Sequence, residues 1–512
     1  MKFARTIMLV TVLAAVATLP AFASQTQDVV KVSHAKAKQV FESAVDAMGG
    51  ADALRSVETI ILESEADLYP RLQTPTPDGP HEGFKLKETV VYDMKQNRLA
   101  IDSKNTGGGF SNHNKTIIAN GEGQNFDLLG KTVTPIPAGQ VTTPQFTQYY
   151  RRMPNLILAT ALQRQNTLRY LGEENFQGKP HDVITFVHAD GSQIALYVDR
   201  GTKLLSKYEL MYPDAITGDD AAEIIYDGFT TVNGVKVPTG WTWKQAGQVV
   251  GKFKYKVQVN PKLDDSTFAM DATGYQKAPA NNAAARQVGV QKLAEGVHLV
   301  ENLGGGNYNV MAVEFPDYIA VVEAPVDVPT SEQAIAQIKK AIPNKPIKYV
   351  VVTHFHSDHS GGLRAFAAEG ATVITTPGNK NLMTAIFSSK RPDAFARSGR
   401  KPSIQYVQNG RHTLRGGDQV LELYEIGSPH AKEMMVAYLP SQRVLFQGDL
   451  FFASYENAPF GAPQQVTQDF YSKLKGLNLA VDKLAGVHGR VSNMQELASS
   501  LKTEGTATAA AR

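Results

Sequence analysis

Three histidines and one aspartate occupy a stretch of six residues with the sequence HFHSDH. The stretch follows Tyr349 to Val352, a wholly apolar run that predicts a short buried strand. Alternate residues of an extended chain share a face, so His354 and His356 can point to one metal ion. The chain must then turn, and Asp358 and His359 can point to a second ion. This spacing favours a metal site over three solvated histidines in a loop.

The donor types narrow the choice of metal. Imidazole and carboxylate together suit Zn²⁺, with Fe and Mn as alternatives. The chain contains no cysteine, which excludes thiolate ligands, disulfides and a cysteine nucleophile.

The segment HFHSDHSGG resembles the HxHxDH signature of the metallo-β-lactamase superfamily. The resemblance covers roughly residues 288 to 500. It implies an αββα sandwich with the metals at one edge, between the sheets. It also implies three further ligands, each in a loop after a predicted strand or helix: His430, Asp449 and His488.

Carried over residue by residue, the family pattern implies two metal ions per chain, most simply zinc. The first ion would be bound by His354, His356 and His430. The second would be bound by Asp358, His359 and His488. Asp449 and a hydroxide would bridge the two. Metals about 3.5–4 Å apart lower the pKa of water and polarise the group to be cleaved. Asp358 is also expected to orient the hydroxide, which makes it the predicted catalytic residue.

One position departs from the family pattern. Many relatives carry an aspartate at the end of an early strand, where it anchors the ligand loop, and this chain has Glu323 instead. The longer side chain could do the same job, although a solvated loop glutamate is an equally reasonable interpretation. A bridging Asp449 resembles glyoxalase II, lactonases and phosphodiesterases more than true β-lactamases. No pattern in the sequence names the substrate.

The pattern of apolar residues divides the chain into two parts. Residues 24–274 predict an antiparallel β-rich domain, with hairpins at 183–198 and 229–238. Residues 275–287 are poor in large apolar residues and are predicted to be a linker. Strand-like and helix-like runs alternate in residues 288–505, as expected for the metallo-β-lactamase fold. One helix is predicted from Thr330 to Ala341, with Thr330 and Gln333 as a capping box.

Short motifs in the first part resemble those of periplasmic lipoprotein carriers. They are residues 47–55, 197–199 with 202–204, and 226–229 with 234–238. Those carriers fold as a curved antiparallel sheet around a helix, a half-barrel that can hold an acyl chain. The resemblance implies either a module that binds a hydrophobic ligand or substrate, or a scaffold or dimerisation domain.

The first 23 residues are typical of a secretory signal peptide. Lys2 and Arg5 precede the apolar stretch Ile7 to Leu19, and Ala21-Phe22-Ala23 is a small-x-small cleavage site. The mature chain is expected to begin near Ser24, in the periplasm or outside the cell. The alternative is an uncleaved anchor, but the apolar stretch is short for a span. No other span is predicted.

The net charge of the chain bears on whether the protein acts on nucleic acid or on small molecules. The net charge is +3, and removing the signal would lower it to about +1. A near-neutral chain lacks the general electrostatic footprint of a nucleic-acid-binding protein, which with export argues against a nuclease. The sequence therefore predicts an exported hydrolase that acts on a small ester, lactone, amide or phosphodiester, with a hydrophobic substrate as one option. The alternative is a non-catalytic carrier or sensor of a lipid-like ligand with a structural metal site.

Overall fold

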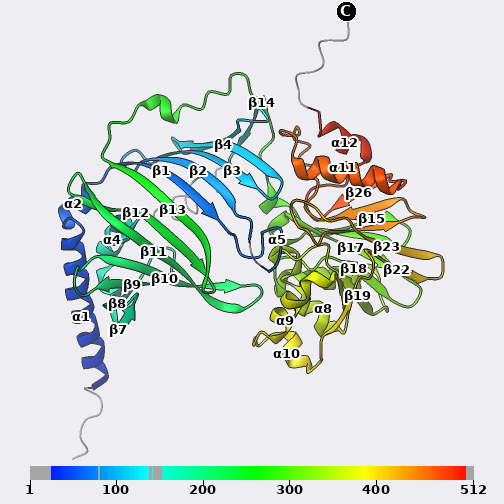
Figure 1. The fold of residues 1–512 in the computed structure, drawn as a ribbon, viewed down its shortest axis with the longest axis horizontal. Helices are drawn as coiled ribbons and strands as arrows, with labels where there is room; N and C mark the ends of the chain where they lie inside the picture. The colour runs from blue at the N-terminus through cyan, green and yellow to red at the C-terminus, as the bar shows by residue number, and fades with distance from the viewer. Residues whose placement is uncertain (1–24, 79–80, 138–140, 142–152, 503–512) are drawn as a thin grey trace, which may run out of the picture.

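The computed structural model describes residues 25–78, 81–137, 141 and 153–502, which form two sheet-rich parts side by side (Figure 1). The predicted signal peptide and Ser24 lie outside the described residues. Within those ranges, no helix is both long enough and apolar enough to cross a bilayer.

In the described chain, the N-terminal part is a single 14-stranded sheet in the order β14-β6-β5-β4-β3-β2-β1-β13-β12-β11-β10-β9-β8-β7. All neighbouring strands are antiparallel except β14 and β6, which are parallel. The sheet curves strongly (Figure 1). Its strands are β1 (Thr59–Leu68), β2 (Phe84–Asp93), β3 (Arg98–Gly107), β4 (Phe110–Ala119), β5 (Glu122–Asp127), β6 (Thr132–Pro135), β7 (Arg169–Phe176), β8 (Lys179–Val187), β9 (Gln193–Asp199), β10 (Leu205–Asp214), β11 (Gly218–Val232), β12 (Val235–Gln245), β13 (Gln248–Val259) and β14 (Gln276–Lys277).

Period-2 alternation places one face of this sheet in a core. On β1, Ile60 and Leu62 are fully buried while Glu63 and Glu65 are exposed. Helix α1 (Gln25–Ala47) contributes Phe41 to the same core, together with α2 (Ala51–Arg55) and α4 (Pro154–Leu162). The predicted hairpins are confirmed as β8–β9 and β11–β12. The half-barrel likeness to lipoprotein carriers stays a prediction.

Residues 289–486, all of them described, form two further sheets. The seven-stranded sheet is mixed, with antiparallel pairs from β15 to β18 and parallel pairs from β18 to β21. The five-stranded sheet is antiparallel up to β25, and β26 adds a parallel edge. The strands are β15 (Gly289–Ala294), β16 (Val297–Asn302), β17 (Tyr308–Glu314), β18 (Ile319–Val322), β19 (Ile347–Val351), β20 (Thr372–Thr375), β21 (Ser403–Tyr406), β22 (Arg411–Gly416), β23 (Gln419–Glu425), β24 (Met435–Leu439), β25 (Val444–Gln447) and β26 (Lys483–Gly486).

These two sheets pack face to face with helices on their outer faces. Met311 of β17 and Phe446 of β25 both belong to the core between the sheets. Ala312 and Leu445, one position along each strand, instead join the core under the helices. The helices of that outer layer include α6 (Val328–Ala341), α8 (Leu363–Glu369) and α11 (Gln465–Leu477). The arrangement is the predicted αββα sandwich.

The predicted linker is partly ordered by both parts of the molecule. Gln276 and Lys277 form β14 beside β6 of the first sheet. Further along, Arg286 donates a hydrogen bond to the carbonyl of Gly306 and pairs with Glu456. The segment therefore contacts each sheet-rich part in turn.

Loops at one end of the N-terminal sheet dock onto the sandwich. Ile216, in the turn between β10 and β11, is 1% exposed and lies in the C-terminal core. At the turn between β3 and β4, the amide of Ser111 donates to Gln464 Oε1 at 2.8 Å, and the amide of Val466 donates to the carbonyl of Gly109 at 3.2 Å. The long connection between β1 and β2 makes a third contact.

Replacing Ile216 with alanine should therefore destabilise the docked molecule. A buried isoleucine truncated to alanine costs about 2–5 kcal/mol, because apolar contacts are lost and a cavity remains. Denaturant unfolding would measure the change. Met211→Ala is the matched control, since Met211 lies on the same hairpin and is 67% exposed. Equal stability of the two variants would contradict the docking role of Ile216.

Candidate metal centre

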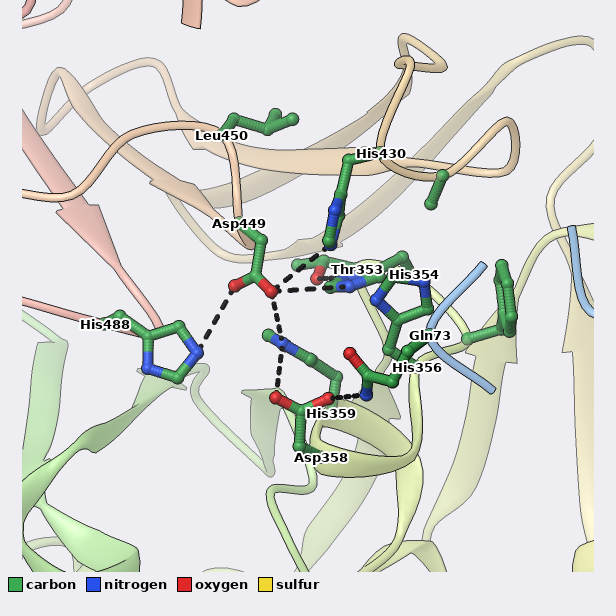
Figure 2. A network of polar contacts seen from close by, with 12 residues as sticks. Gln73, Thr353, His354, His356, Asp358, His359, His430, Asp449, Leu450 and His488 are labelled. Atoms are coloured by element: carbon green, nitrogen blue, oxygen red, sulfur yellow. Dashed lines mark hydrogen bonds and ion pairs between the residues drawn. The ribbon is translucent and has the colours of Figure 1, made fainter. Parts of the chain in front are cut away.

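The sandwich brings all seven predicted ligands together (Figure 2). They fall into two groups that share Asp449, and in each group the potential ligand atoms lie within 4.8 Å of one another. The first group is His354, His356, His430 and Asp449, and the second is Asp358, His359, Asp449 and His488.

Each of these residues lies just beyond the end of a strand. His354 and His356 follow β19, and the short helix α7 (Ser357–Ser360) then turns the chain and carries Asp358 and His359. The other three ligands follow strands of the five-stranded sheet: His430 after β23, Asp449 after β25 and His488 after β26. The chain thus reaches one edge of the sandwich from both sheets.

Two glycines in these motifs allow the close packing of the ligand loops. A Cβ at Gly448 would lie 2.7 Å from Thr353 Oγ1 and 3.0 Å from His354 Nδ1. A Cβ at Gly362 would lie 1.9 Å from Ser331 Oγ on α6. Any larger residue at either position would push the loop away from the site.

The carboxylate of Asp449 is the centre of the cluster. Its Oδ2 lies 3.1 Å from His359 Nε2, 3.3 Å from His430 Nε2 and 3.9 Å from His354 Nε2. Its Oδ1 lies 3.3 Å from His488 Nε2, on the other side (Figure 2). Oδ2 thus lies near histidines of both ligand groups and Oδ1 near His488 of the second, so the carboxylate stands between the two groups, as a bridging ligand would.

The remaining ring nitrogens of four histidines face neighbours outside the cluster. His354 Nδ1 lies 3.1 Å from Thr353 Oγ1, and His359 Nδ1 lies 3.4 Å from Glu323 Oε2. His356 Nε2 and His488 Nδ1 hydrogen-bond the backbone carbonyls of Thr74 and Asn307, at 3.0 and 2.7 Å. Such partners fix the tautomer and the ring orientation of a metal-binding histidine.

The atoms that face the interior of the cluster fit a bound cation. Buried polar atoms without a hydrogen bond are rare in folded proteins. Yet among the described residues His354 Nε2, His356 Nδ1, both ring nitrogens of His359, His430 Nε2 and Asp449 Oδ1 are buried and make none. All of these atoms except His359 Nδ1 face the shared interior of the two groups, where bound metal ions would satisfy them.

Protonation states also suit metal binding. Burial and neighbouring imidazoles lower the pKa of His354 well below its usual value and that of His356 to about 3, so both are neutral. Burial alone would raise the pKa of Asp449, but His359 beside it holds this pKa well below its ordinary range. Burial opposes the charged form of His359, yet Asp449 and Asp358 raise its pKa. The proton on His359 therefore offsets the negative charges of Asp449 and Asp358, as a bound cation would.

Glu323 is buried beneath the ligand loop and is not solvated. Its side chain is fully buried, its Oε1 accepts from the amide of Thr353 at 3.2 Å, and its Oε2 faces His359. The backbone at Glu323 has φ +90°, a strained value for a non-glycine residue. The anchoring interpretation from the sequence therefore holds over the solvated one.

Several residues at the centre carry no signal in the sequence. Gln73 Nε2 donates to Asp358 Oδ1 at 2.6 Å, and the Tyr308 hydroxyl donates to Asp358 Oδ2 at 3.3 Å. The ring of Phe110 meets that of His430 edge to face, with centroids 5.4 Å apart. Gln73, Thr74 and Phe110 come from the N-terminal sheet, more than 240 residues before the ligands that they contact.

Residues 303–486 match the model of the Metallo-beta-lactamase superfamily. This part of the chain is therefore similar to the metallo-β-lactamase superfamily. The resemblance of HFHSDHSGG to the family signature is thereby confirmed, and all seven predicted ligands lie within or just beyond the matched residues.

Individual relatives match only parts of the chain. A "Metallo-beta-lactamase type 2" from Elizabethkingia meningoseptica is 24% identical over 168 residues, which are 32% of this chain and 61% of the relative. A "Linear primary-alkylsulfatase" from a Pseudomonas strain is 40% identical over 57 residues, 11% of each chain. Solved metallo-β-lactamases from Pontibacter korlensis and Hirschia baltica are 22% and 19% identical. Each covers 42% of this chain, and the matches take in 97% and 96% of those structures with TM-scores of 0.32.

The buried position of Glu323 within the metallo-β-lactamase region predicts a stability effect that does not depend on metal. Glu323→Leu removes the acceptor for the Thr353 amide and for His359, and a buried group left unpaired costs about 1–3 kcal/mol. Glu323→Gln keeps the shape and one acceptor, so its loss should be smaller. Denaturant unfolding of metal-free protein would show the order. A Glu323→Leu variant as stable as the parent would contradict the anchoring role.

Proposed function

We propose that the protein is a binuclear metal-dependent hydrolase, with zinc as the expected metal and Fe or Mn as alternatives. The observation that carries the proposal is the pair of ligand groups joined through Asp449, with buried acceptors on both sides of its carboxylate. The first ion would be held by His354, His356 and His430, and the second by Asp358, His359 and His488. Two such ions would lower the pKa of water towards neutrality and polarise the bond to be cleaved.

The chain's own residues supply the orientation and proton handling. Asp358 is ionised, because the charge of His359 beside it and a hydrogen bond from Gln73 outweigh burial and hold its pKa well below the usual range. Its Oδ1 is occupied by Gln73, which leaves Oδ2 as the atom that would orient the attacking water. Burial and the nearby Asp358 raise the pKa of Tyr308, so this hydroxyl stays protonated and donates to Oδ2.

We further propose a small substrate with an ester, lactone, amide or phosphodiester linkage and an apolar substituent. Aromatic rings surround the centre: Phe110 packs against Phe452, and Phe452 and Tyr308 both lie against the ring of His488. Phe452 is 41% exposed and can contact a bound molecule. Relatives named as a β-lactamase and an alkylsulfatase support a hydrolytic reaction on a small molecule. The signal-like first 23 residues support export to the periplasm or beyond.

The purified mature protein should bind about two metal ions per chain. Seven ligand-type side chains converge on two adjacent positions, and each position has at least one buried acceptor without a hydrogen bond. Elemental analysis after loading with zinc and extensive dialysis gives the count. Retention of one ion or fewer would rule out the binuclear site.

Asp449→Asn should weaken binding of the second ion and reduce hydrolysis by at least about 10²-fold, as the loss of a key electrostatic stabiliser does. The variant keeps the volume of the side chain but removes the charge that both ligand groups face. Metal titration and a panel of ester, lactone, amide, phosphodiester and sulfate-ester substrates would measure the two effects.

The control for this variant is His412→Ala. His412 lies on β22, outside both ligand groups, and its loss should leave metal content and activity near the parent values. Full metal content and activity in Asp449→Asn would show that the carboxylate does not bridge two ions.

A further inference from the structure

The connection between β1 and β2 reaches from the N-terminal sheet onto the ligand loops of the sandwich. Four consecutive residues of this connection form hydrogen bonds there. The Leu72 carbonyl accepts from the Ser357 amide at 3.2 Å, and Gln73 Nε2 donates to Asp358 Oδ1 at 2.6 Å. The Thr74 carbonyl hydrogen-bonds His356 Nε2 at 3.0 Å. The Pro75 carbonyl accepts from the Lys432 amide at 2.8 Å. The contacts reach the loop of His356 and Asp358 and also the loop of His430.

From these contacts we propose that the N-terminal sheet is an integral part of the metal centre, and that Gln73 is a positioning residue for the second metal site. The inference rests on the binuclear hydrolase proposed above and deepens it. It makes residues 72–75 the part of the centre that orients one ligand from each metal group.

Gln73 decides which oxygen of Asp358 faces the metal site. Its amide holds Oδ1, and Oδ2 is directed towards His359 (Figure 2). Oδ2 lies 3.5 Å from His359 Nε2 and 3.3 Å from the Tyr308 hydroxyl. The Asp358 side chain is 26% exposed, so without Gln73 it could rotate towards water. A carboxylate fixed in one rotamer binds a metal more tightly, because less conformational freedom is lost on binding.

The Thr74 carbonyl determines which ring nitrogen of His356 is left to bind a metal. A backbone carbonyl can only accept, so the proton of this imidazole must sit on Nε2. Nδ1 is then the unprotonated nitrogen, and it is the buried atom without a hydrogen bond that faces the first ligand group. The ligand atom of His356 is therefore chosen by the N-terminal sheet.

The connection is held rigidly enough to act in this way. At its base, Arg71 pairs with Asp214 at the end of β10, and the two side chains are 11% and 9% exposed. Burial would raise the pKa of Asp214, but hydrogen bonds from Tyr212, Arg71 and the Thr217 amide lower it to about 2. Thr74 is 1% exposed, and its hydroxyl donates to the Thr76 carbonyl.

The backbone of the connection is also strained at the point where it turns towards the ligands. Leu72 has φ +52°, in the left-handed region that a branched apolar side chain rarely adopts. Such strain persists only where surrounding contacts determine the conformation. Here those contacts are the hydrogen bonds to the ligand loops themselves.

The test compares Gln73→Met with the parent in the full-length protein. Methionine keeps the length and volume of glutamine but has no donor. The two zinc dissociation constants are measured by competition with a chelator, and the Co²⁺-loaded proteins are compared by visible absorption. Gln73→Met should weaken the second ion by about 10–100-fold, the usual effect of losing such a supporting contact. The first ion should bind within about twofold of the parent, because Thr74 still contacts His356.

Controls separate positioning from general stability. Gln193→Met changes the same residue type at an exposed site on β9 of the same sheet and should leave both constants unchanged. Asp78→Ala removes a contact of the same connection with Asn381, but it keeps the Gln73 donor. It should weaken the second ion much less than Gln73→Met does. If Gln73→Met does not fold, Gln73→Ala replaces it.

The outcomes distinguish this inference from the function that it rests on. Parent protein with two ions and a Gln73→Met variant with unchanged constants and Co²⁺ spectrum would overturn the positioning role alone. Equal weakening of both ions in Gln73→Met and Asp78→Ala would show a structural role and also overturn it. A parent that binds fewer than two ions would overturn the binuclear proposal, and this inference with it.

Discussion

The burial of one carboxylate among imidazoles sets the requirements for the rest of the structure. Asp449 is 7% exposed and lies within 4 Å of four histidines. An ion taken out of water costs several kcal/mol unless other groups compensate it. His359 provides part of the compensation by holding a proton, and metal ions would provide it on both sides of the carboxylate. The sheets, the glycines and the N-terminal loops all serve to keep these groups in place.

The imidazoles around Asp449 are held in place by hydrogen-bond acceptors from distant parts of the chain. Glu323 supports His359 from the end of β18, the Asn307 carbonyl supports His488 just before β17, and the Thr74 carbonyl supports His356 from the N-terminal sheet. Loss of any of these partners would free a ring to rotate or to change tautomer. The geometry of the centre is thus a property of both sheet-rich parts.

Local patterns in the sequence were sufficient to predict the sandwich and the set of ligand residues. The apolar run before His354 is β19, and strands alternate with helices from β18 to β21, whereas β21 to β25 follow one another without a helix between them. The start of one helix differs from the prediction. The capping box predicted at Thr330 and Gln333 is wrong, because α6 begins at Val328 and the side chain of Asp327 accepts from the Thr330 amide. The early start follows from Pro329, which suits the first turn of a helix.

The contribution of the N-terminal sheet could not be predicted, for a physical reason. Three of the four residues 72–75 make their contacts through backbone carbonyls, which every residue possesses, so residue types carry no trace of them. Gln73 is an ordinary polar residue in a loop until the fold sets it beside Asp358. The position of Gln73 beside Asp358 depends on the register of β1 against β2 and β13, because this register fixes where the connection leaves the sheet. A one-residue slip in that register would exchange the two faces of β1 and displace the connection, so the buried face of the N-terminal sheet is what aligns Gln73 with the metal centre.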